Sequence, residues 1–171
     1  MAQPGAITFK GNPMTLEGEA LEVGSAAPEF TLHYADNGIQ ALTLADLKGK
    51  PTILSVVPSL DTPVCAVQTK KFNEELAALG DKVNAVTVSR DLPFAQARFC
   101  GAEDIKMRTA SDYQTHGFGT DWGLTIEELK ILARAVFVLN ADGEIAHKEV
   151  VGEVAEEPDY ATAMASLRML L

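Results

Sequence analysis

The chain has 171 residues, of which 47 % are hydrophobic and 22 % charged, a composition typical of one soluble globular domain spanning residues 1–171. Its net charge of −10 argues against nucleic acid or an anionic membrane as a partner, because both require a basic face. No run of about 18 apolar residues occurs, so no membrane-spanning helix is expected.

The first elements expected along the chain are two hairpins. Alternating apolar and polar residues on either side of Gly11-Asn12-Pro13 indicate an N-terminal β-hairpin at about residues 6–18. No secretory signal precedes it, which favours a cytoplasmic location. A second turn signal, Asp36-Asn37-Gly38, separates strand-like runs at 30–32 and 41–44.

The middle of the sequence alternates strands with helices. The β-branched run at 52–57 is typical of a strand covered on both faces, and a helical pattern follows it as far as Gly80. A second buried strand is expected at 83–88. Asp91 then suits the N-cap of a second helix that includes Cys100.

The last elements are a strand pair and a helix. Runs at 135–139 and 145–151 flank the turn Ala141-Asp142-Gly143, and an amphipathic helix is expected at 158–170. Strands that alternate with helices, followed by a hairpin and a helix, predict an α/β fold. The order is thioredoxin-like, with a central mixed sheet flanked by helices and the N-terminal β-hairpin added.

The segment from Pro58 to Cys65 carries the strongest chemical signal. Thr62 suits an N-cap whose hydroxyl accepts a backbone N–H, and Pro63 suits the first helical position. Cys65 then lies near the third position, where unpaired N–H groups and the helix dipole favour the thiolate. A small buried hydrophobe is the commoner role for such a cysteine, but Thr62 and Pro63 favour a reactive thiol. We assign no catalytic role to Asp61, because a carboxylate beside the Cys65 thiol would disfavour formation of the thiolate.

Three segments of the sequence resemble the thiol peroxidase subgroup of the peroxiredoxin family. Pro58-x-x-x-Thr62-x-x-Cys65 is similar to the peroxiredoxin signature, and residues 90–100 are similar to the segment that holds the subgroup's second cysteine. Arg134 with the strand after it resembles the strand that carries the subgroup's arginine. The stretch at 120–130 departs from the pattern, since it lacks a Pro-Leu pair, and this departure concerns substrate preference.

The resemblance implies a role for each matched residue. Cys65 would attack a hydroperoxide as the peroxidatic cysteine, and Cys100 would resolve the product into an intramolecular disulfide. Thr62 and Arg134 would activate and orient the reacting groups, and Pro58 would shape the loop that shields the sulfur from water. The family further implies reduction by thioredoxin, no metal or organic cofactor, and a homodimer.

Alternatives remain for several of these residues. Arg134 can instead form a surface ion pair, Arg98 can take its role, and Cys100 can be a buried core thiol. A disulfide requires Cα atoms within about 7 Å, and two cysteines on different helices need not start that close. Our hypothesis is that one or both helices unwind locally during turnover.

Two other functions are compatible with the sequence. The first is a thiol–disulfide oxidoreductase, which the absence of a Cys-x-x-Cys pair disfavours. The second is a binding or holdase module with a structural disulfide, which would keep its function when Cys65 is replaced.

Overall fold

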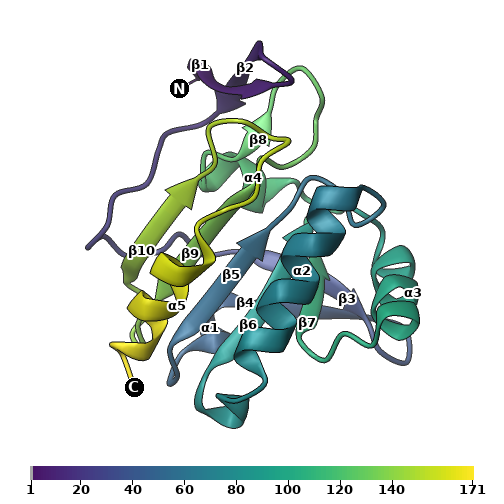
Figure 1. The fold of residues 1–171 in the computed structure, drawn as a ribbon, viewed down its shortest axis with the longest axis vertical. Helices are drawn as coiled ribbons and strands as arrows, with labels where there is room; N and C mark the ends of the chain where they lie inside the picture. Colours follow the sequence, from purple (N-terminus) through teal and green to yellow (C-terminus); the bar gives the residue numbers. More distant parts are fainter. Residues whose placement is uncertain (1) are drawn as a thin grey trace.

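A seven-stranded mixed sheet forms the centre of the computed structural model, which describes residues 2–171 (Figure 1). Its strand order is β10-β9-β5-β6-β7-β3-β4. Strands β5, β6 and β7 are parallel neighbours, whereas β9 runs antiparallel to β5. The strands are β3 (Thr31–Ala35), β4 (Ile39–Thr43), β5 (Thr52–Val56), β6 (Asn84–Ser89), β7 (Arg108–Ser111), β9 (Ala135–Leu139) and β10 (Ile145–Val150).

Two helices, α2 (Pro63–Leu76) and α5 (Tyr160–Arg168), lie side by side over one face of this sheet (Figure 1). A third, α3 (Pro93–Glu103), packs against β3 and β7. The opposite face is covered by the short helices α1 (Leu44–Leu47) and α4 (Gly117–Asp121) together with loops. The predicted α/β fold with a mixed, helix-flanked sheet is therefore confirmed.

The two central strands, β5 and β9, are buried along their whole length, which explains their continuous apolar sequences. Successive side chains of these strands point to opposite faces of the sheet. Ile53 and Val138 pack with Phe72 beneath α2 and α5. Leu54 and Phe137 pack on the other face with Trp122.

The predicted N-terminal hairpin is present as β1 (Gln3–Phe9) and β2 (Asn12–Glu17), and β8 (Thr125–Ile126) extends it to three strands. Glu153 fastens the hairpin to the rest of the chain. Its carboxylate accepts hydrogen bonds from the amides of Ala155 at 2.7 Å and Gly11 at 2.8 Å and from the Thr8 hydroxyl at 3.0 Å. These hydrogen bonds lower the pKa of Glu153 to about 2, and the bonds from the two amides have the largest effect.

Several predicted boundaries differ from the structure. The first hairpin turns at Lys10 and Gly11, because both have positive φ, and Pro13 already belongs to β2. Phe30 precedes β3, and Leu44 begins α1 instead of ending a strand. The short elements α1, α4, β7 and β8 were not predicted. Within residues 2–171 no helix is both long enough and apolar enough to cross a membrane.

Candidate active site

The segment Pro58–Cys65 lies where parallel strands β5 and β6 end, the edge at which open α/β sheets place their sites. Arg134 reaches the same edge by a different route. It directly precedes β9, and because β9 is antiparallel to β5, Ala135 pairs with Val56 at the end of β5. Arg134 and the segment that contains Cys65 therefore lie at the same edge of the sheet.

In the first turn of α2, the three predicted residues occupy their predicted positions. Thr62 is the N-cap residue, Pro63 is the first helical residue and Cys65 is the third. The predicted cap hydrogen bond is wrong, because the Thr62 hydroxyl donates to the Ser59 carbonyl at 2.8 Å and accepts no backbone N–H. A tight turn causes this, since the Thr62 amide donates to the same carbonyl at 3.1 Å.

Cys65 is completely buried and packs with Val57, Leu60 and the side of Phe99 from α3. Its sulfur accepts a hydrogen bond from the backbone N–H of Ser59 at 3.5 Å. Pro58 is buried just before that donor. The thiol therefore lies at a helix N-terminus, shielded from water, with one amide donor aimed at it.

Asp91 is not the cap of α3, in contrast to the sequence prediction, because Leu92 occupies the N-cap position. Its carboxylate instead binds the loop in front of Cys65. It accepts hydrogen bonds from the Ser59 hydroxyl at 2.7 Å and from the Leu60 amide at 2.8 Å. The Ser89 hydroxyl, at the end of β6, also donates to it at 2.7 Å.

Arg134 is only 2 % exposed, so the alternative of a surface ion pair is wrong. Its Nε donates to the Val154 carbonyl at 2.9 Å, and one terminal nitrogen donates to the Gln68 side-chain oxygen at 3.0 Å. Gln68 lies one turn after Cys65 on α2 and is itself fully buried. Arg98, the competing arginine, is exposed on α3.

Cys100 is half-buried on α3, and its sulfur lies 3.7 Å from the Thr109 hydroxyl on β7. Burial raises the pKa of this thiol, and the Thr109 hydroxyl partly opposes that effect. Both cysteines are free thiols. Phe99 packs against the Cys65 cluster, whereas Cys100 lines a separate hollow of about 370 Å³ with Tyr34 and Thr109.

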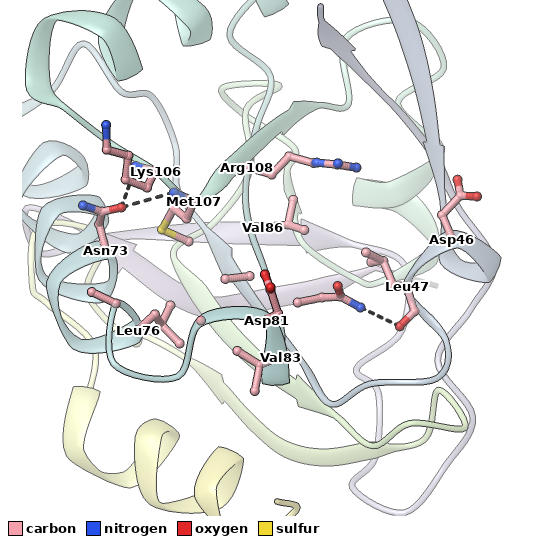
Figure 2. Close-up of a pocket in the computed structure, with 14 residues that line it drawn as sticks. Asp46, Leu47, Asn73, Leu76, Asp81, Val83, Val86, Lys106, Met107 and Arg108 are labelled. Carbon is pink, nitrogen blue, oxygen red and sulfur yellow. Dashed lines mark hydrogen bonds between the residues drawn. The ribbon is translucent and has the colours of Figure 1, made fainter.

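A wider cavity of about 610 Å³ lies at the other end of the sheet, where β6 and β7 begin. Figure 2 shows Asn73 and Leu76 of α2 on one side of it and Asp46 with Leu47 on the other. It contains neither Cys65 nor Arg134, so it is separate from the candidate site. Among residues 2–171 no group of three acidic, histidine or cysteine side chains has the arrangement of a metal site.

Sequence reasoning missed three residues of this site. Gln68 holds Arg134, Ser59 supplies the amide donor, and Asp91 binds the loop that contains Ser59. The signal for Gln68 was a polar amide three residues after Cys65 on the same helix. The signal for Asp91 was its place just after a buried strand that ends at the site.

The Redoxin family profile matches residues 22–164, and the chain belongs to that family. Its sequence is 49 % identical to a thiol peroxidase of Bacillus subtilis over 96 % of this chain and 98 % of that protein. A thiol peroxidase of Halalkalibacterium halodurans is 50 % identical over 97 % of this chain and 99 % of its own length. The chain is thus a peroxiredoxin-type enzyme of the thiol peroxidase group, as its sequence motifs predicted.

Solved structures agree with this placement. A peroxiredoxin-like protein from Aquifex aeolicus superposes with a TM-score of 0.90 at 38 % identity and covers 99 % of both chains. A thiol peroxidase from Chromobacterium violaceum has a TM-score of 0.82 over 95 % of both chains, and at 14 % identity it supports the fold alone.

Proposed function

We propose that this enzyme reduces hydrogen peroxide and organic hydroperoxides through a Cys65 sulfenic acid and an intramolecular Cys65–Cys100 disulfide, which thioredoxin then reduces. One observation carries the proposal. Cys65 is the third residue of α2, and the Ser59 amide donates a hydrogen bond to its sulfur. The helix dipole and the amide donor both direct positive partial charge at this sulfur, and the thiolate is the attacking nucleophile.

In the first step the Cys65 thiolate attacks the terminal oxygen of the hydroperoxide. A sulfur–oxygen bond forms, the oxygen–oxygen bond breaks, and the leaving oxygen takes a proton to become water or an alcohol. Arg134 supports this step, because its two hydrogen bonds to Val154 and Gln68 leave three guanidinium N–H donors for the peroxide oxygens. Thr62, the N-cap residue of α2, is exposed, and we assign it a role in orienting the peroxide from the family resemblance.

In the second step the Cys100 thiolate attacks the sulfenic sulfur, a disulfide forms, and the hydroxyl leaves as water once it is protonated. The resting structure keeps the two thiols in different surroundings, because Cys100 faces Thr109 while Phe99 covers Cys65. A local opening of α3 would withdraw Phe99 from Cys65 and would at the same time expose Cys100. Exposure would also remove the burial that raises the pKa of this thiol, so the same motion would make it a better nucleophile.

In the third step a dithiol protein exchanges with the disulfide and restores both thiols, and we assign this role to thioredoxin from the family resemblance. We further propose a cytoplasmic, homodimeric enzyme with residues 1–171 as one domain. An exposed apolar surface at the start of α3 supports a second copy as partner, since Leu92 is 51 % and Phe94 is 64 % exposed.

Hydroperoxide consumption with a thioredoxin system tests the proposal in the native chain, in Cys65→Ser and in Cys100→Ser. We expect no turnover in Cys65→Ser, and in Cys100→Ser a single burst without continued turnover. Native-rate consumption by Cys65→Ser would refute the proposal and would favour the binding module instead.

A further inference from the structure

The carboxylate of Asp91 connects the end of β6 with the loop before α2, which lies 31 to 32 residues earlier in the sequence. It binds the Ser59 hydroxyl and the Leu60 amide in the loop before α2, and the Ser89 hydroxyl at the end of β6. The loop bonds, at 2.7 and 2.8 Å, are short and charge-assisted, which makes them stronger than hydrogen bonds between neutral groups.

The carboxylate is itself held in place. The Ser89 hydroxyl that donates to Asp91 also accepts a hydrogen bond from the Gln96 side chain at 2.9 Å. Gln96 is buried on α3 and donates a second hydrogen bond to the Ala110 carbonyl at 3.0 Å. Strand β6, strand β7 and helix α3 thus fix the position from which Asp91 binds the loop.

The loop that Asp91 binds presents a donor to the reactive sulfur. The Ser59 amide donates to Cys65 Sγ at 3.5 Å, so the position of the loop decides whether this donor faces the sulfur. Asp91 binds the side chain of Ser59 and the amide of the next residue, and so fixes the peptide unit between them. The Ser59 hydroxyl further accepts a hydrogen bond from the Asp61 amide, which tightens the same turn.

We propose that Asp91 is a positioning residue for the peroxidase reaction, which keeps the Ser59 amide aimed at the Cys65 sulfur. The inference rests on the proposed role of Cys65 as nucleophile. Asp91 touches neither sulfur nor substrate in this account. Its effect is on the first step, because a misplaced donor no longer stabilises the attacking thiolate.

The test measures the second-order rate constant of sulfenic acid formation with hydrogen peroxide, in the Cys100→Ser background so that the second step cannot occur. Dimedone labelling and mass spectrometry follow the product. Asp91→Ala should slow this step about tenfold, the scale of one lost hydrogen bond to a charged group. Asp91→Asn should slow it no more than about threefold, because its amide oxygen can still accept the Leu60 N–H.

Two control variants separate positioning from other effects. Asp121→Asn removes an exposed carboxylate at the end of α4 that accepts no hydrogen bond within residues 2–171, so it tests the loss of a charge alone. Leu167→Ala opens a cavity in the core under α5 and tests lost stability alone. Both should react within about twofold of the parent.

Asp91→Ala at the parental rate, or Asp91→Asn as slow as Asp91→Ala, would overturn the proposal. A parent that forms no sulfenic acid at all would refute the proposed function itself, and this inference with it.

Discussion

Gln68 and Arg134 form a buried pair one helical turn from Cys65, with the arginine donating to the Gln68 side-chain oxygen at 3.0 Å. The Gln68 nitrogen donates in turn to the Ser55 hydroxyl on β5 at 2.8 Å. The arginine that the sequence motif identifies is therefore oriented by an amide that is anchored to the central sheet. Orientation matters here because guanidinium donors lie in a fixed plane.

Replacement of Gln68 by alanine should therefore weaken both the site and the fold. A buried guanidinium that loses an acceptor costs about 1 to 3 kcal/mol in the free energy of unfolding, and sulfenic acid formation should slow as Arg134 loses its orientation. Urea denaturation and single-turnover kinetics measure the two effects. Gln114→Ala, at an exposed position, is the control, and equal behaviour of the two variants would contradict the role of Gln68.

The pH dependence of Cys100 gives a second prediction. Burial raises the pKa of this thiol above its ordinary value of 9.0, and the Thr109 hydroxyl lowers it in part. In a Cys65→Ser chain, alkylation of Cys100 should follow a pH profile displaced to higher pH than in the urea-unfolded chain. Thr109→Val should displace it further, because the thiolate loses its donor. A profile that moves to lower pH in Thr109→Val would contradict this account.

A third prediction concerns Arg90 and Asp112, a buried ion pair with an N–O distance of 3.3 Å and side chains 6 % and 0 % exposed. Asp112 also accepts the amides of Phe118 and Gly119, so it fixes the start of α4. Asp112→Ala leaves Arg90 buried without its charge partner and should lower the free energy of unfolding by about 3 kcal/mol or more.

Lys106→Ala is the matched control for this prediction. Lys106 pairs with Asp104 at 2.8 Å on the surface, where the side chains are 80 % and 84 % exposed, and its loss should leave the free energy of unfolding nearly unchanged. If both variants lost the same free energy of unfolding, burial would not make the Arg90–Asp112 pair more important for stability than a surface pair.

The attachment of the N-terminal hairpin should depend on pH through Glu153. Its pKa falls from 4.5 to about 2 on folding, so its contribution is complete above pH 4.5 and is lost as pH falls towards 2. Glu153→Gln should therefore melt below the native chain at pH 6, and the difference should shrink between pH 4.5 and 2. A constant difference in melting temperature across that interval would contradict this role of the carboxylate.

The sequence predicted best what local rules determine. Thr62 and Pro63 place Cys65 in the first turn of α2, and the apolar runs of β5 and β9 indicate strands buried on both faces. Asp91 was wrongly predicted as the N-cap of α3, because the two residues whose hydrogen bonds its carboxylate accepts, Ser59 and Leu60, lie about thirty residues earlier in the sequence. The sequence preference for helix N-caps considers only the residues of the helix that follows, so it cannot detect such distant partners.

The short elements were missed for a related reason. Helix α4 (Gly117–Asp121) has too few residues to show a hydrophobic period, and Asp112 fixes its first amides from outside the helix. Likewise the partner of Arg134 is Gln68, a residue 66 positions away that only the crossing of α2 over β5 and β9 brings near. Such pairs follow from tertiary packing.

The mass of the reduced chain after one equivalent of hydrogen peroxide shows whether Cys65 and Cys100 react in sequence. We expect the native chain to lose two hydrogens, and we expect peptide mapping to find Cys65 linked to Cys100 within one chain. Cys100→Ser should instead gain one oxygen at Cys65. A native chain that keeps both thiols free, or that gains oxygen at Cys65 without forming the disulfide, would contradict the account.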